Sequence, residues 1–100
     1  MFLLSKYISR TDLESFCRRN HITKMALFGS VIRDELTPES DIDILVEFHK
    51  NHIPGLMDLA GMEIELSETI GRKVDLRTPA ELSRYFRDEV LKTAKVEYAA

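Results

Sequence analysis

Apolar residues recur along the chain at two spacings, and each spacing predicts a different kind of element. Helical spacing extends over Thr11–Arg19 and Leu56–Ile70. Alternation with a period of two extends over Asp41–Phe48 and predicts a strand with one buried face. Shorter apolar runs predict three more strands, at Lys24–Phe28, Lys73–Arg77 and Val96–Tyr98.

Capping and turn residues indicate where these elements begin and end. Thr11 and Glu14 predict a capping box at the start of the first helix, and Asn20 suits a left-handed exit from it. Gly71 is well placed to end the second long helix. Thr78–Glu81 predicts another capping box, with proline at the first helical position.

Strands and helices therefore alternate along the chain. A short helix is expected at Ser30–Glu35, and the helical sequence near the C-terminus continues to about Ala94 with a break near Arg84. This order predicts an α+β (α/β) fold in which helices flank a small mixed β-sheet. A chain of 100 residues predicts a single domain, spanning 1–100.

Composition narrows the class of protein. The formal net charge of −3 argues against binding of nucleic acid by bulk electrostatics. The one cysteine, Cys17, lies on the apolar stripe of its helix and is expected in the core. A single cysteine forms no internal disulfide, which fits a reducing, cytoplasmic setting. No apolar run approaches the length that spans a membrane, so no membrane association is expected.

Two carboxylates interrupt the alternating apolar strand. Asp is depleted in strands, yet Asp41 and Asp43 project from the same face, about 7 Å apart at the backbone. Like charges this close repel unless a cation lies between them. Mg²⁺ binds through a few carboxylates together with phosphate oxygens of a substrate. The pair therefore predicts a metal site, with a solvated strand face as the alternative.

A turn that suits phosphate lies shortly before these carboxylates. Gly29 permits close backbone approach, and Ser30 is expected at the start of a short helix, where N–H groups face an anion. Ser30 can alternatively serve only as a helix cap. Arg33 lies one helical turn later, where it can reach a triphosphate or pair with Glu35 or Glu39.

A third carboxylate, Asp75, lies in another apolar strand. If that strand pairs beside Asp41–Val46, Asp75 can complete a cluster of three carboxylates, help bind the metal ion that activates an attacking hydroxyl, and accept the proton of that hydroxyl. A single surface aspartate is also common, so Asp75 alone indicates little. With the Gly-Ser turn, the three acids describe nucleotidyl transfer, in which two metal ions orient a nucleoside triphosphate and pyrophosphate leaves.

At these residues the chain resembles the minimal nucleotidyltransferases (MNT) of the DNA polymerase β superfamily. Their pattern is Gly-Ser, about ten residues, Asp-x-Asp and a later Asp on a neighbouring strand. The matching positions are Gly29, Ser30, Asp41, Asp43 and Asp75. One departure from many relatives is Asp34, which follows Arg33 where they have glycine and brings a negative charge close to the phosphate turn.

The resemblance implies a polymerase-β-like fold, two Mg²⁺ ions and ATP as substrate. It also implies an antitoxin that transfers AMP to a tyrosine hydroxyl of a partner HEPN toxin. A binding module that restrains its partner by stoichiometric contact is one alternative, and transfer to a small molecule or an RNA end is another. Met57 and Ile64 widen the apolar face of their helix, which a toxin or a homo-oligomer can cover.

Overall fold

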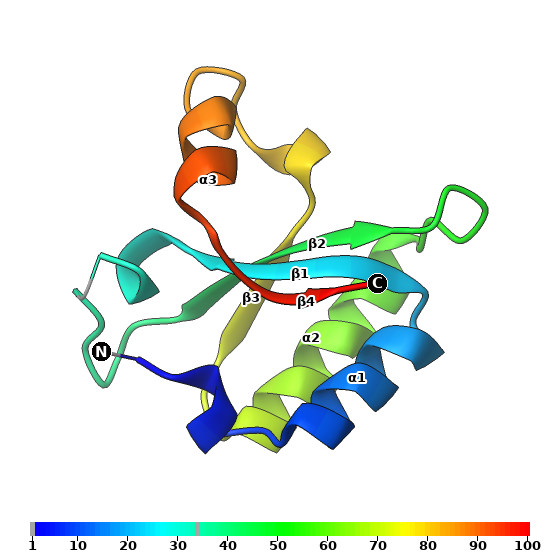
Figure 1. Ribbon diagram of the computed structural model, residues 1–100, viewed down its shortest axis with the longest axis horizontal. Helices are drawn as coiled ribbons and strands as arrows, with labels where there is room; N and C mark the ends of the chain where they lie inside the picture. Colours follow the sequence, from blue (N-terminus) through cyan, green and yellow to red (C-terminus); the bar gives the residue numbers. More distant parts are fainter. Residues whose placement is uncertain (1, 34) are drawn as a thin grey trace.

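The computed structural model describes residues 2–33 and 35–100, which form a four-stranded sheet with helices on both faces (Figure 1). The strands are β1 (Ile22–Phe28), β2 (Ile42–Phe48), β3 (Val74–Arg77) and β4 (Lys95–Ala99). Their order across the sheet is β3-β2-β1-β4. β1 pairs antiparallel with β2 and β4, whereas β2 and β3 are parallel. The mixed sheet predicted from the sequence is confirmed.

One face of the sheet carries the main core. The helices α1 (Arg10–Arg19) and α2 (Leu56–Ile70) lie on this face (Figure 1). The core residues contributed by the sheet and by these two helices are Leu13, Phe16, Cys17, Ile22, Met25, Leu27, Ile42, Ile44, Val46, Met62, Leu66, Ile70, Val74, Leu76 and Tyr98. Cys17 is fully buried there, as its place on the apolar stripe predicts.

The opposite face is covered by a shorter layer. The 3-10 turn η3 (Pro79–Glu81) and the helix α3 (Arg87–Thr93) lie over it, in the connection between β3 and β4 (Figure 1). Leu45 points to this side and is buried, as is Leu82 just after η3. Of the described residues, those of α3 contribute none to the core.

Several predicted element ends are confirmed. The helix α2 spans the predicted residues, and Gly71 ends it in the left-handed region with φ 79°. Thr78 and Glu81 form the predicted capping box, with Pro79 at the first position. The helical sequence beyond it is broken in the predicted region, because α3 begins only at Arg87.

The predicted cap of the first helix is wrong. The Ser9 hydroxyl accepts from the Asp12 N–H at 3.1 Å, so the helix begins one residue before Thr11. Glu14 instead pairs with Arg10 at 3.1 Å. Ser9 lies three residues before Asp12 and therefore offers an earlier cap of the same chemistry.

The predicted exit of the first helix is also one residue off. Asn20 keeps a negative φ of −103°, and His21 takes the left-handed conformation with φ 58°. The Asn20 side-chain amide donates to the Phe16 carbonyl at 2.9 Å. This bond satisfies a carbonyl of the last helical turn, so the change of direction moves to the next residue.

In the described part of Ser30–Glu35, the predicted helix is not formed. This segment instead begins with the 3-10 turn η2 (Gly29–Val31), closed by N–H groups of Ile32 and Arg33 that donate to the Gly29 carbonyl at 3.2 and 3.3 Å. Gly29 has φ 74°, which interrupts regular helix geometry at its first residue. Among residues 2–33 and 35–100, no helix is both long and apolar enough to cross a membrane.

Candidate active site

Asp43 and Asp75 occupy directly paired positions on neighbouring strands. The parallel register of β2 and β3 sets Asp43 opposite Asp75, with Ile42 opposite Val74. Neighbouring strands lie about 4.8 Å apart. Because Ile42 and Val74 point into the core, the two aspartates point to the opposite face, beneath the layer formed by η3 and α3. The side-by-side placement of these two strands is as the sequence predicts.

Asp43 lies in a perturbed electrostatic environment. Partial burial raises the pKa of its carboxyl, and the neighbouring charges of Asp75 and then Asp41 raise it further. Arg77 and Arg33 act in the opposite direction and lower the pKa. The ionised form of Asp43 is therefore disfavoured when no cation is bound among these acids.

Two basic side chains lie beside the other two carboxylates. Lys73 is 3.7 Å from Asp41, and Arg77 is 3.2 Å from Asp75. Both pairs are substantially exposed to solvent, so each contributes little to stability and can separate readily. Within the described part of the chain, no basic group lies within ion-pair distance of Asp43. Asp43, which is half-buried, thus has no direct ion-pair partner among the described residues.

The Gly-Ser turn lies directly against Asp43. A β-carbon built on Gly29 would overlap the Asp43 carboxylate, and the positive φ of Gly29 also disfavours any other residue. The register of the sheet explains the contact, since Phe28 at the end of β1 pairs with Asp43 on β2. The N-cap residue of this described turn is Phe28, which makes no side-chain cap hydrogen bond, so both roles considered for Ser30, phosphate binding and helix capping, stay predictions.

Arg33 follows the turn and is mostly exposed. Its guanidinium forms an ion pair with Glu35, one of the two arrangements that the sequence left open. It is still close enough to lower the pKa of Asp43, so its charge acts on the acidic group. Asp34, the departure from the pattern of relatives, lies outside the described residues.

Hydrogen bonds from neighbouring side chains hold the segments that carry Asp41 and Asp75 in place. The Arg72 guanidinium donates to the carbonyls of Thr37 and Ser40 at 2.6 and 2.9 Å, immediately before Asp41. The Glu63 carboxylate accepts from the Leu76 N–H at 2.7 Å and holds β3 to α2. These roles depend on contacts between segments that are distant in the sequence.

The donor set suits a hard divalent cation. Three carboxylates around a phosphate-sized turn provide the oxygen ligands that Mg²⁺ binds. The described residues nevertheless include no group of three His, Cys, Asp or Glu side chains already gathered to hold a metal ion. The reason is electrostatic, because like charges separate and Asp41 and Asp75 turn toward Lys73 and Arg77. To gather around a cation, the half-buried side chains of Asp41 and Asp75 would have to leave these basic partners.

A cavity of about 520 Å³ adjoins the Gly-Ser turn on the side of α3. Its lining comes from both segments and comprises Phe28, Gly29, Ile32, Arg33, Phe86, Glu89, Val90 and Thr93. The four residues from the C-terminal segment are missed by sequence reasoning. No local pattern in the chain indicates that α3 folds back over a turn more than fifty positions earlier.

Comparison with known proteins gives a consistent result. The family model described as "Nucleotidyltransferase domain" matches residues 10–98. The chain is 34% identical over 71 residues to "Protein adenylyltransferase MntA" of Thermococcus cleftensis, a match that covers 71% of this chain and 70% of that one. This match is long enough to establish common family membership.

Two solved structures share the fold. A crystal structure of a toxin–antitoxin with AMP-PNP superposes with a TM-score of 0.74 at 20% identity, covering 93% of this chain and 75% of that chain. A tri-AMPylated Shewanella oneidensis HEPN toxin in complex with MNT antitoxin gives a TM-score of 0.65 at 20% identity, covering 90% and 69%. The chain therefore belongs to the nucleotidyltransferase domain family and is a nucleotidyltransferase.

Proposed function

We propose that this nucleotidyltransferase transfers AMP from ATP to a tyrosine hydroxyl of a HEPN-type toxin, in a reaction that requires two Mg²⁺ ions. The relative named protein adenylyltransferase supports a protein as the acceptor. One solved structure with this fold is that of an MNT antitoxin in complex with a tri-AMPylated HEPN toxin, and it supports a HEPN toxin as the partner. The chain would then act as the antitoxin of a toxin–antitoxin pair.

The observation that carries the proposal is the contact of three segments at one point of the sheet. Asp43 is in register with Asp75 on one side, and the Gly29 backbone lies against it on the other. A phosphate held by the turn is therefore next to the carboxylates. In-line displacement at phosphorus depends mainly on such positioning and on charge stabilisation.

Each residue has a defined task in this reaction. Gly29 and Ser30 hold phosphate oxygens, and Arg33 adds positive charge beside them. Asp41, Asp43 and Asp75 would hold the cations, and Asp75 would also accept the proton of the attacking hydroxyl. Divalent cations at this site would neutralise the triphosphate and favour the ionised hydroxyl. The new bond joins the hydroxyl oxygen to the α-phosphorus, the bond to the bridging oxygen breaks, and pyrophosphate leaves.

The proposal is tested with α-labelled ATP, Mg²⁺ and the product of the neighbouring gene. We expect label on that protein with the wild-type chain and none with Asp41→Asn plus Asp43→Asn. Glu47→Gln is the matched control, since Glu47 lies further along the same strand at an exposed position. Label from γ-labelled ATP should not transfer, because that phosphate leaves in pyrophosphate.

A second function, restraint of the partner by stoichiometric binding alone, is favoured by the exposed apolar side of α2. Leu56, Met57 and Ile64 are 84%, 88% and 61% exposed. A face of this kind is typical of a protein interface. If the wild-type chain transfers no label while the double variant still forms a tight complex, this second function replaces the first.

A further inference from the structure

We propose that the cavity between α3 and the Gly-Ser turn holds the base of the nucleotide substrate, with Phe86 and Glu89 as its recognition residues. The inference rests on the proposed function and extends it to the part of the substrate that does not react. It gives α3, which carries none of the proposed metal-binding residues, a role in recognising the base.

The first argument is the position of the cavity. Gly29 and Arg33 belong both to the lining of this cavity and to the turn beside Asp43. A nucleotide whose phosphates lie on that turn therefore has its nucleoside at the mouth of the cavity. The volume of about 520 Å³ is within the range typical of small-molecule sites.

The second argument is the incomplete packing of α3. Of the described residues, those of α3 include none that is buried, although Val90 and Leu91 are apolar. Phe86, just before the helix, is 48% exposed and lines the cavity. A half-exposed aromatic ring in the lining of a partly apolar cavity provides a surface on which a base can stack.

The third argument is the chemistry of the lining. Phe28, Ile32 and Val90 provide apolar contacts for a planar ring, and the same lining includes the polar side chains of Glu89 and Thr93. The Thr93 hydroxyl donates to the Glu89 carbonyl at 2.9 Å, which leaves its lone pairs free. The Glu89 carboxylate accepts hydrogen bonds only. These hydrogen-bond acceptors therefore favour a base that carries an exocyclic amino group, as adenine does.

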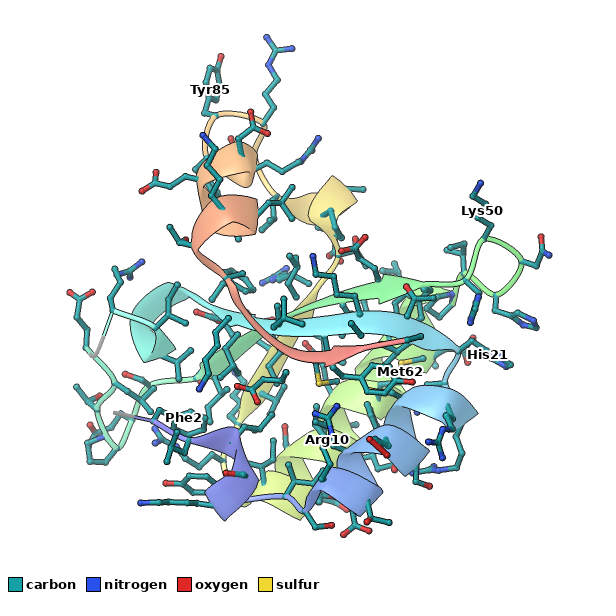
Figure 2. All side chains as sticks on the ribbon, viewed as in Figure 1. Phe2, Arg10, His21, Lys50, Met62 and Tyr85 are labelled. Atoms are coloured by element: carbon teal, nitrogen blue, oxygen red, sulfur yellow. The ribbon has the colours of Figure 1, made fainter. Side chains whose placement is uncertain are left out.

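Neighbouring residues provide matched controls. Tyr85 is also aromatic but is 88% exposed and does not line the cavity. Figure 2 shows its side chain at the outer end of the segment before α3, directed away from the sheet. Asp88 is the corresponding acidic control, since it is exposed and adjoins Glu89 without lining the cavity.

The first experiment measures binding of Mg-ATP and of Mg-bound inorganic triphosphate to the full chain. Phe86→Ala should weaken ATP binding roughly tenfold, the usual effect of losing one base–aromatic stack, and leave inorganic triphosphate unchanged. Tyr85→Ala should change neither. Unchanged binding of inorganic triphosphate also shows that the variant is folded. Equal ATP affinity for wild type and Phe86→Ala would overturn the proposal.

The second experiment tests the edge of the base. Inosine triphosphate has a carbonyl where ATP has the amino group, so the wild-type chain should prefer ATP. Glu89→Gln should reduce that preference severalfold, while Asp88→Asn should keep it. If wild type transfers AMP and both Phe86→Ala and Glu89→Gln leave the KM for ATP unchanged, the cavity assignment fails and the proposed function stands. If wild type neither binds ATP nor transfers AMP, both fail.

Discussion

The backbone of Gly29 lies against the carboxylate of Asp43, so closely that no β-carbon fits between them. This contact joins the turn after β1 to the acidic face of β2. The phosphate turn and the strand that carries Asp43 are therefore packed directly against each other.

Gly29→Ala should reduce both stability and nucleotidyl transfer. The added methyl group overlaps Asp43 and requires a positive φ, at a cost of about 1–3 kcal/mol in the free energy of unfolding. Displacement of the turn should lower kcat/KM about a hundredfold. Gly61→Ala is the control, because that position lies within α2 and a β-carbon there meets no neighbour. Urea unfolding should show a gain for this control.

Asp43→Asn should stabilise the chain at neutral pH without divalent cations, although it removes activity. The pKa of Asp43 is raised in the folded state by burial and by Asp75 and Asp41. The folded chain therefore keeps this proton to higher pH than the unfolded chain, and it loses that advantage as pH rises through the folded pKa. The gain from Asp43→Asn should accordingly be present at pH 7 and shrink toward pH 3.

Urea unfolding at several pH values checks this expectation. Glu39→Gln removes the same charge from an exposed position and should give no comparable gain. If Asp43→Asn is less stable than wild type at pH 7 in EDTA, repulsion among the carboxylates does not lower the free energy of unfolding, and the expectation is wrong.

Arg72→Ala should loosen the segment that leads into Asp41. Its guanidinium bonds to the carbonyls of Thr37 and Ser40, and their loss should cost about 1 kcal/mol. The Ser40 N–H, which donates to the Thr37 carbonyl at 3.0 Å, should exchange faster with deuterium. Both bonds come from Nη2, and the lysine ammonium ends one bond closer to the backbone, so Arg72→Lys keeps the charge but should behave more like alanine than wild type. Unaltered exchange in Arg72→Ala would refute this anchoring role.

Cys17 should be inert toward alkylation in the folded chain. Burial raises the pKa of its thiol to about 12, so very little thiolate is present at pH 8. Iodoacetamide should modify the protein rapidly in concentrated urea and only very slowly in native buffer, where local or global opening must come first. Fast modification under native conditions would contradict the buried position.

The sequence predicts elements best where local chemistry decides them. The length of α2 follows from its apolar spacing and from Gly71, and the capping box of Thr78 and Glu81 is complete within four residues. The start of α1 is misplaced because Ser9 and Thr11 are both good caps. Local rules identify such candidates but do not rank two that stand two residues apart.

The site divides in the same way. The three aspartates stand out because acids are unfavourable in apolar strands, and this signal is present in the sequence itself. The partners of Arg72 and the placement of Phe86 and Glu89 beside Gly29 arise from contacts between distant segments. Such contacts are determined by how the connection after β3 crosses the sheet, which no local pattern encodes.

That connection has a consequence for how the chain folds and opens. The sheet order puts β3 and β4 at opposite edges, so the residues between them pass over β2 and β1. With little buried surface in α3 to hold it down, this bridge is the part of the described chain expected to detach first. A small molecule bound beneath this connection would hold it against the sheet, between the outer strands β3 and β4. Loading with substrate would then slow unfolding from the C-terminal edge and protect the last strand from proteases.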